Sequence, residues 1–188
     1  MLTWIAAHQI PWIQSTAVEI TALGTGSVVI MIALVAALFL SLGPHRYRAL
    51  LLIAATAGGL ALNGILKLIF HRPRPDIFEW GTHAVSSSFP SGHAMNAVIV
   101  YSTVAYLAAR LESRRWVRWT TLLLAALVIA LVCLSRIYLG VHYPSDIAAG
   151  AVVGFAWAAF CMSGIEAARV FGKRYRSGGS PGDRPPPG

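Results

Sequence analysis

Three polar clusters interrupt a sequence that is otherwise largely apolar, and each lies where a long apolar run begins or ends. They occupy residues 67–75, 89–93 and 135–146. Together they contain cations, which neutralise phosphate oxygens, and histidines, which attack phosphorus or transfer protons. These residue types predict a site for phosphoryl transfer, provided that the elements between the clusters bring all three to one surface.

The cations of interest are Lys67, Arg74 and Arg136. Lys67 lies near the end of an apolar run, where a charge is costly unless it reaches the headgroups or meets an anion. Arg74 is followed by Pro75, which places in a stiff loop a planar guanidinium able to donate two parallel hydrogen bonds to phosphate. Arg136 ends a further apolar run. We expect these three cations to bind one anion.

The second cluster, Pro90-Ser91-Gly92-His93, opens an apolar run. Ser91 suits the N-cap of a helix, and Gly92 permits close approach of the backbone to a ligand. The free N–H groups and the dipole at such a helix start attract anions. A cap explains Ser91 and Gly92 but not His93, which is therefore a candidate acid or base.

In the third cluster, His142 and Asp146 are four residues apart, so they share nearly one face if a helix starts this early. Pro144 suits the first turn of that helix. A carboxylate bonded to one ring nitrogen sets the histidine tautomer and leaves the other nitrogen as a nucleophile or base. An interaction of Asp146 with the helix dipole is the alternative role.

The elements that must position these residues are membrane-spanning helices. Of the 188 residues, 56% are hydrophobic and only 12% are charged, about half the charged share of an ordinary soluble domain. A crossing needs about 20 mostly apolar residues, and the suitable segments are 17–42, 49–70, 92–109, 119–137 and 144–165. The sequence predicts an all-α, polytopic transmembrane helix bundle with five spans, or six if residues 1–15 also cross.

Residues 1–170 are expected to form one membrane domain, in which residues 1–15 are an interfacial lead-in. Residues 171–188 are basic and then rich in Gly and Pro, which is typical of a disordered tail. Cys133 and Cys161 are expected to be buried free thiols. The glycines of the spans suit packing within the chain or dimerisation equally well, and they leave the oligomeric state open.

The cations also predict an orientation. If the spans alternate, four of the 15 cations, Lys67, Arg72, Arg74 and Arg136, lie on the side of the clusters. The other 11 lie on the opposite side, namely Arg46, Arg48, Arg110, Arg114, Arg115, Arg118, Arg169, Lys173, Arg174, Arg176 and Arg184. The positive-inside rule makes that side, with the C-terminal tail, cytoplasmic. We therefore expect a plasma (inner) membrane protein with all three clusters on the non-cytoplasmic face.

Several functions do not fit this pattern. The net charge of +8 falls in loops between apolar runs and not on one soluble face, so nucleic acid is not an expected partner. Neither metal-ligand spacing nor a carboxylate cluster is present, so no metal or other cofactor is expected. Residues 1–15 lack the features of a signal peptide. His71 and Arg72 are expected to be solvated loop residues, and contacts with the loop or with the rim of the substrate site are the alternative.

The three clusters resemble, in order and spacing, the signature of the type 2 phosphatidic acid phosphatase (PAP2) family: Lys67-x6-Arg74-Pro75, Pro90-Ser91-Gly92-His93 and Ser135-Arg136-x5-His142-x3-Asp146. The resemblance implies a helical bundle with a metal-independent phosphatase site. It implies that His142 is the nucleophile that forms a phosphohistidine and that Asp146 orients it. His93 would protonate the leaving oxygen and then deprotonate water, and the phosphate-binding set would be Lys67, Arg74, Ser91, Gly92 and Arg136.

The sequence therefore predicts an enzyme that hydrolyses a lipid phosphate or polyprenyl pyrophosphate whose tail stays in the bilayer. Phosphatidic acid, phosphatidylglycerol phosphate and undecaprenyl pyrophosphate are the candidates that the resemblance suggests. The vanadium-dependent haloperoxidases share the motif set, but they are soluble, and five apolar spans argue against them. The alternative from another class is a non-catalytic lipid-phosphate carrier or anion-binding scaffold, which would not need His93, His142 and Asp146 together.

Overall fold

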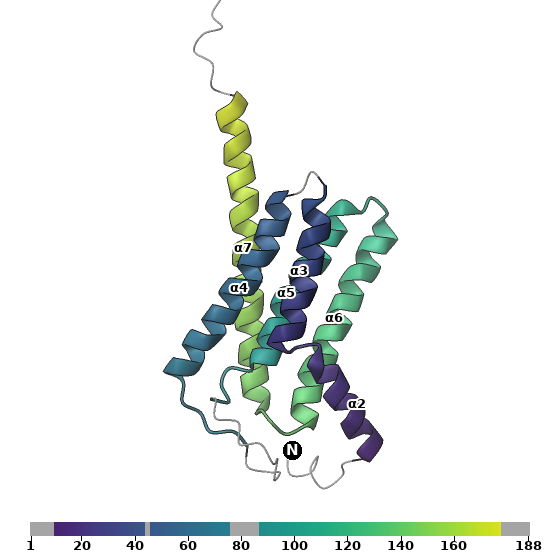
Figure 1. Ribbon diagram of the computed structural model, residues 1–188, viewed down its shortest axis with the longest axis vertical. Helices are drawn as coiled ribbons and strands as arrows, with labels where there is room; N and C mark the ends of the chain where they lie inside the picture. The colour runs from purple at the N-terminus through teal and green to yellow at the C-terminus, as the bar shows by residue number, and fades with distance from the viewer. Residues whose placement is uncertain (1–9, 44–45, 76–86, 178–188) are drawn as a thin grey trace, which may run out of the picture.

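The computed structural model describes residues 10–43, 46–75 and 87–177, and within them all regular secondary structure is helical. The helices are α2 (Pro11–Ala22), α3 (Gly26–Ser41), α4 (Arg46–Ile69), α5 (Gly92–Leu111), α6 (Arg115–Tyr138) and α7 (Pro144–Ser177). They form one elongated bundle in which α7 projects beyond the other helices at one end (Figure 1). The predicted all-α bundle is confirmed.

Four helices are long and apolar enough to cross a membrane: α4, α5, α6 and the part of α7 from Pro144 to Gly164. The pair α2 and α3 makes a fifth candidate span, but it is bent by 48°. The span expected over residues 17–42 is thus a bent pair of helices that begins at Pro11 and ends at Ser41. Residues 1–9, most of the expected interfacial lead-in, lie outside the described part of the chain.

Contacts with α5 accompany the break between α2 and α3. The Tyr101 hydroxyl donates to the Leu23 carbonyl at 3.0 Å, and Asn96 Nδ2 donates to the Gly24 carbonyl at 3.4 Å. These side chains satisfy carbonyl groups at the break. A Cβ at Gly24 would lie 3.0 Å from the His93 carbonyl oxygen, so this turn needs glycine in order to approach α5.

Helix α5 is the centre of the bundle. It packs most extensively against α6 and α7, and it also contacts α3 and α4. Small side chains permit these close approaches, and the buried alanines of α5 are Ala94, Ala97, Ala105 and Ala109. The outer helices instead expose many large apolar side chains, among them Leu38, Phe39, Leu123, Leu124, Leu134, Val152, Phe155 and Phe160. Such a surface suits lipid and not water.

Glycines bring α4 and α7 against their neighbours. A Cβ at Gly58 would lie 2.4 Å from the Trp157 ring, whose Nε1 donates to the Ala55 carbonyl at 2.9 Å. On α7, a Cβ at Gly150 would lie 2.6 Å from the backbone oxygen of Ser91, and one at Gly154 would lie 2.9 Å from that of Met95. These glycines therefore serve packing within the chain.

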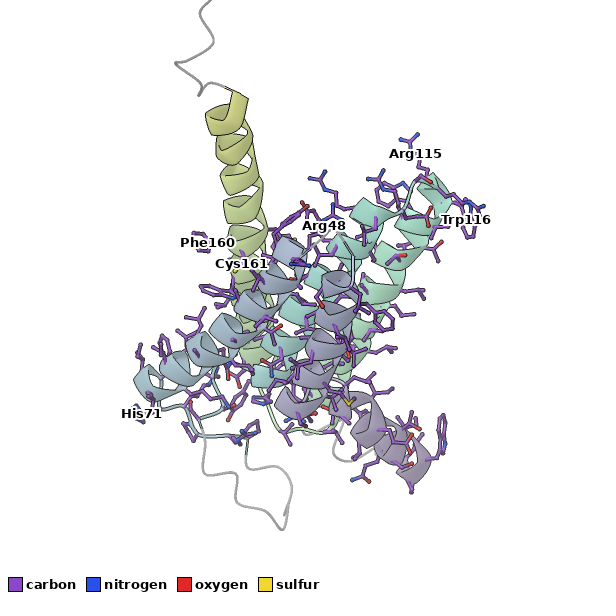
Figure 2. All side chains as sticks on the ribbon, turned by 45° about the horizontal axis from the view of Figure 1, so that its top comes forward. Arg48, His71, Arg115, Trp116, Phe160 and Cys161 are labelled. Carbon is purple, nitrogen blue, oxygen red and sulfur yellow. The ribbon has the colours of Figure 1, made fainter. Side chains whose placement is uncertain are left out.

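The two ends of the bundle differ in charge and content. Helices α4 and α6 end, and α5 and α7 begin, at the end that carries the three polar clusters. Figure 2 places Arg48 and Arg115 at the end opposite His71.

Helix α7 continues to Ser177, so it extends into the segment expected to be a disordered tail. Cys133 and Cys161 are free but only partly buried, which corrects the expectation of full burial.

The approach of α7 to the start of α5 can be tested with Gly150→Ala. The added methyl group would meet the Ser91 backbone oxygen, which cannot move without displacing the first turn of α5. We expect a loss of about 1–3 kcal/mol, seen as a lower melting temperature in detergent. Gly164→Ala is the control, since a Cβ there meets nothing within 4 Å. Equal melting temperatures of the two variants would contradict this packing.

Candidate active site

The structure brings the three polar clusters together at one end of the bundle. Lys67 lies in the last turn of α4 and Arg136 in the last turn of α6. His93 follows the first residue of α5, and Asp146 lies in the first turn of α7 with Pro144 as the first helical residue. The backbone N–H of Ser91 donates to the Asp146 carbonyl at 3.0 Å, which joins the starts of α5 and α7 directly.

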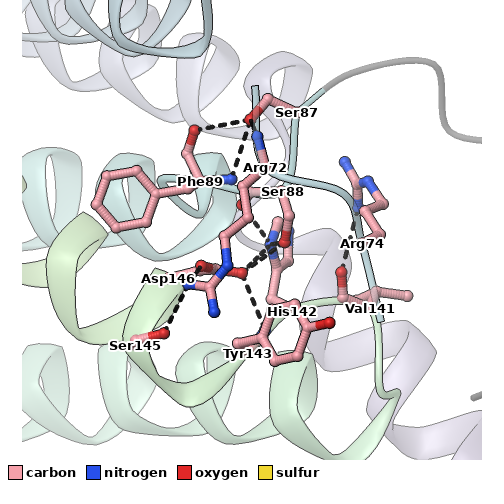
Figure 3. A network of polar contacts seen from close by, with 10 residues as sticks. All are labelled: Arg72, Arg74, Ser87, Ser88, Phe89, Val141, His142, Tyr143, Ser145 and Asp146. Carbon is pink, nitrogen blue, oxygen red and sulfur yellow. Dashed lines mark hydrogen bonds and ion pairs between the residues drawn. The ribbon is translucent and has the colours of Figure 1, made fainter. Parts of the chain in front are cut away.

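His142 is held from one side of its ring, as Figure 3 shows. The ring is buried, and its Nδ1 lies 2.8 Å from the carbonyl oxygen of Ser88. Because a carbonyl only accepts, Nδ1 carries the hydrogen and Nε2 keeps its lone pair. Asp146 Oδ2 is 3.7 Å from Nδ1, which is too long for a hydrogen bond. The direct histidine–carboxylate bond expected from the sequence is thus replaced by a bond to Ser88.

Arg72 contacts the carboxylate that the sequence assigned to His142. Its Nη1 lies 2.7 Å from Asp146 Oδ1 and 2.8 Å from Ser145 Oγ, and its guanidinium carbon lies 4.2 Å from the centre of the Tyr143 ring (Figure 3). The expectation that Arg72 is a merely solvated loop residue is wrong. His71, by contrast, is exposed as expected.

The predicted phosphate-binding cations gather around His93. Lys67, Arg74 and Arg136 all lie within electrostatic range of its ring. In the described part of the chain, neither Lys67 nor Arg136 has a carboxylate partner, because the one carboxylate of the site pairs with Arg72. Arg74 Nη1 also donates to the Val141 carbonyl at 3.4 Å. The cluster therefore has a local excess of positive charge, which favours an anion.

Two donors at this cluster are buried without a partner among the described residues, namely the Ser91 hydroxyl and Nε of Arg136. Ser91 occupies the N-cap position of α5, but its side chain makes no capping hydrogen bond, unlike the expected cap. Arg136 uses Nη1 to donate to the Thr21 hydroxyl at 3.1 Å. Buried donors left unsatisfied are costly, and the oxygens of an anion are acceptors of the kind that such donors need.

Gly92 makes a close approach that the sequence did not reveal. A Cβ at this position would lie 3.0 Å from Oδ1 of Asn63, whose Nδ2 contacts Met95 Sδ at 3.5 Å. The close approach on the Cβ side is therefore to a side chain of α4.

Burial controls the ionisation of two groups in the loops of the site. Burial, then the Arg136 and Arg74 cations, lower the pKa of His142 to about 3, while the hydrogen bond to Ser88 opposes this shift. Burial also lowers the pKa of Arg74 from its usual value, and the Asp146 carboxylate acts in the opposite direction. His142 is therefore a neutral imidazole over the physiological pH range, the form that can act as a nucleophile.

Sequence reasoning missed Thr21, Arg72 and Ser88. Thr21 lies on α2, far along the chain from its partner Arg136. Arg72 is inside the first cluster, and its position between a histidine and a proline gave no sign of a partner on another helix. Ser88 precedes the second cluster in a serine-rich segment, where a turn residue is the ordinary reading.

The fold and the match to known sequences define a multi-pass membrane protein of one family. Residues 47–169 match the PAP2 superfamily, so the chain belongs to this superfamily, as its three motifs predict. It is a membrane phosphatase of the lipid phosphatase class.

Individual relatives agree with this assignment. The chain is 33% identical over 145 residues to phosphatidylglycerophosphatase B of Bacillus subtilis, a match that covers 77% of this chain and 71% of that protein. It is 31% identical over 137 residues to an undecaprenyl-diphosphatase of Sulfolobus acidocaldarius, covering 70% of this chain and 62% of that protein. The crystal structure of a transmembrane PAP2-type phosphatidylglycerolphosphate phosphatase from Bacillus subtilis superposes with a TM-score of 0.81 at 28% identity, covering 88% and 83% of the two chains.

The neutral state of His142 has a consequence for stability. Its pKa is about 3 in the folded protein, against about 6.5 for an ordinary histidine, so below pH 6.5 the unfolded chain binds a proton that the folded chain does not. Wild type should therefore lose stability relative to His142→Asn as the pH falls from about 7.5 to about 5. Asparagine does not titrate and can still donate to the Ser88 carbonyl.

The measurement is the melting temperature of both proteins in detergent across this pH range. The carboxylates and the other histidines titrate in both proteins, so their effects cancel when one melting temperature is subtracted from the other. Parallel curves would contradict a depressed pKa for His142. A wild type that gains stability relative to His142→Asn in acid would mean that this pKa is raised instead.

Proposed function

We propose that this chain hydrolyses the terminal phosphate of a membrane lipid through a phosphohistidine on His142, without a metal ion. The observation that supports this most directly is the pair of buried, unsatisfied donors beside a cluster of cations and a neutral histidine. Phosphoryl transfer requires mainly that charge on the phosphate oxygens be neutralised and that attacker and leaving group be in line. Lys67, Arg74 and Arg136 would supply the charge that Mg²⁺ supplies in other phosphatases.

In the first step, Nε2 of His142 attacks phosphorus while the bond from phosphorus to the lipid oxygen breaks. His93 gives its proton to that oxygen, so the alcohol or lipid phosphate leaves in neutral or singly protonated form. The Ser91 hydroxyl, the Gly92 N–H group and the three cations hold the remaining phosphoryl oxygens.

In the second step, water attacks phosphorus on the opposite side from His142. Neutral His93 accepts a proton from the water, the bond from phosphorus to Nε2 breaks, and inorganic phosphate is released. The enzyme returns to its starting state with Nδ1 of His142 still protonated and directed at Ser88, as it is in the structure.

The substrate class follows from the position of the site at the end of the spanning helices. A lipid can keep its acyl or prenyl tail in the bilayer while its phosphate enters the cluster. The relatives are named for phosphatidylglycerophosphate and undecaprenyl diphosphate, and the structural match to the former is the reason to test it first.

We further propose that the site faces away from the cytoplasm, across the plasma membrane. The support is the distribution of cations, because Arg46, Arg48, Arg110 and Arg115 lie at or beside the helix ends opposite the site. The positive-inside rule places such loops in the cytoplasm.

The phosphohistidine proposal predicts a specific pattern of activity. Detergent-purified protein should release phosphate from a lipid phosphate panel in the presence of EDTA, and His142→Ala should lower the rate by about a thousandfold or more. A panel of phosphatidic acid, phosphatidylglycerol phosphate and undecaprenyl pyrophosphate would rank the substrates. A substrate with a radiolabelled phosphate should leave its label on the protein. The reaction must be quenched in alkali, because acid would hydrolyse a phosphohistidine.

Release that EDTA abolishes would overturn the metal-free mechanism. No release from any lipid, with His142→Ala binding lipid phosphate as well as wild type, would favour the carrier. Arg115→Gln, at the opposite end of the bundle, is the control for the effect of substitution alone.

The orientation is tested by labelling single cysteines in intact cells. With Cys133 and Cys161 replaced by alanine, His71→Cys and Ser113→Cys each place one thiol at an exposed position, the first beside the site and the second between α5 and α6. A membrane-impermeant maleimide should label the first in intact cells and the second only after lysis. The reverse pattern would place the site in the cytoplasm.

A further inference from the structure

Asp146 is a fully buried carboxylate, and its surroundings explain how it is tolerated. Its Oδ1 accepts from Arg72 Nη1 at 2.7 Å. Its Oδ2 accepts from the Ser88 hydroxyl at 2.5 Å and from the Tyr143 backbone N–H at 2.9 Å. A buried carboxylate is costly unless a cation and several donors surround it. Among the described residues, Arg72 is the cation in contact with it.

Arg72 is itself held in place from several directions. Its backbone N–H donates to Ser87 Oγ at 3.2 Å, and its carbonyl accepts from the Ser88 N–H at 2.9 Å. Its guanidinium lies on the Tyr143 ring and also donates to Ser145 Oγ. Arg72 therefore ties the segment after α4 to the segment before α5 and to the start of α7.

Ser88 connects this arrangement to the histidine. It is fully buried, its hydroxyl donates to Asp146, and its carbonyl accepts from Nδ1 of His142. Asp146 lies too far from Nδ1 to hold the ring by itself. The contacts thus run in order from Arg72 to Asp146, to Ser88 and finally to His142.

We propose that Arg72 and Ser88 are positioning residues for His142, with Asp146 acting on the ring through the Ser88 carbonyl. This inference rests on the proposed function and assigns two further residues to it. Arg72 fixes the carboxylate, the carboxylate fixes the Ser88 hydroxyl, and the Ser88 carbonyl keeps the proton on Nδ1 so that Nε2 is free to attack. Arg72 does not hold the phosphate in this arrangement.

Positioning residues act through others, so a double-mutant cycle tests them. We expect Arg72→Gln to lower kcat by about 10- to 100-fold, the usual effect of losing a group that orients a reactive side chain. Asp146→Asn should lower kcat as well, and the double variant Arg72→Gln/Asp146→Asn should be no slower than Asp146→Asn alone. The double variant should also melt at a higher temperature than Arg72→Gln, because it no longer buries an unpaired carboxylate.

Inorganic phosphate, used as a competitive inhibitor, distinguishes positioning from phosphate binding. Its inhibition constant should change less than about twofold in Arg72→Gln and rise about tenfold or more in Arg74→Gln, which removes a predicted phosphate ligand. Ser88→Ala keeps the carbonyl but loses the link to Asp146, so its loss in kcat should be smaller than that of Asp146→Asn and should vanish in the Asp146→Asn background.

Losses in kcat that add up in the double variant would overturn the proposal. So would an inhibition constant of phosphate that rises as much in Arg72→Gln as in Arg74→Gln, which would make Arg72 a phosphate ligand. Wild-type kcat in Arg72→Gln would also overturn it. In all three cases the loss of activity in His142→Ala would leave the phosphohistidine function standing. Phosphate release that is independent of His142 would instead overturn the function on which the proposal rests.

Discussion

The carboxylate of Asp146 is fully buried, and it is tolerated only while its partners surround it. Those partners come from the first and third polar clusters and from the residue directly before the second. Arg72 belongs to the first, Ser88 directly precedes the second, and the Tyr143 N–H belongs to the third. The backbone carbonyl of Asp146 accepts from the Ser91 N–H group at the start of α5. Asp146 thus joins the segment after α4 to the starts of α5 and α7, and the geometry of the site depends on it.

The pairing of Arg72 with Asp146 leaves the site with an excess of positive charge. Because Arg72 pairs with the buried carboxylate, that carboxylate is not in contact with Lys67 or Arg136. The Ser91 hydroxyl and Nε of Arg136 are also buried without a partner among the described residues. An environment of this kind is unfavourable when empty and favourable when a phosphate enters, which is what a site preorganised for phosphoryl transfer requires. It also keeps His142 neutral, since burial and neighbouring cations lower its pKa.

Close helix packing makes this precision possible within a membrane. Gly150 lets α7 touch the backbone at Ser91, and Gly24 lets the turn between α2 and α3 touch α5 at His93. Thr21 on α2 then reaches Arg136 on α6. Lipid provides no hydrophobic drive between helices, so close packing and polar contacts such as these must hold the bundle together.

Much of this protein could be read from residue types and their periodicity. The lengths of the apolar runs predicted α4, α5 and α6 to within four residues at each end, because a bilayer imposes a length that composition reveals. The motif order predicted the PAP2 superfamily. The ends of the apolar runs predicted that four site residues lie at helix ends, namely Lys67, His93, Arg136 and Asp146. The alternation of the spans then predicted that these residues share one surface.

Other features depended on contacts between residues far apart in the chain. At the break near Gly24, α5 satisfies carbonyl groups that a continuous helix would have used itself. The pairing of Arg72 with Asp146, and the bond from His142 to the Ser88 carbonyl, join segments that no local pattern relates. The sequence by itself determined which chemical groups reach one end of a membrane bundle. Only the tertiary structure decided which of those groups touch each other, because hydrogen bonds and ion pairs depend on distances of a few ångströms that spacing along a chain does not specify.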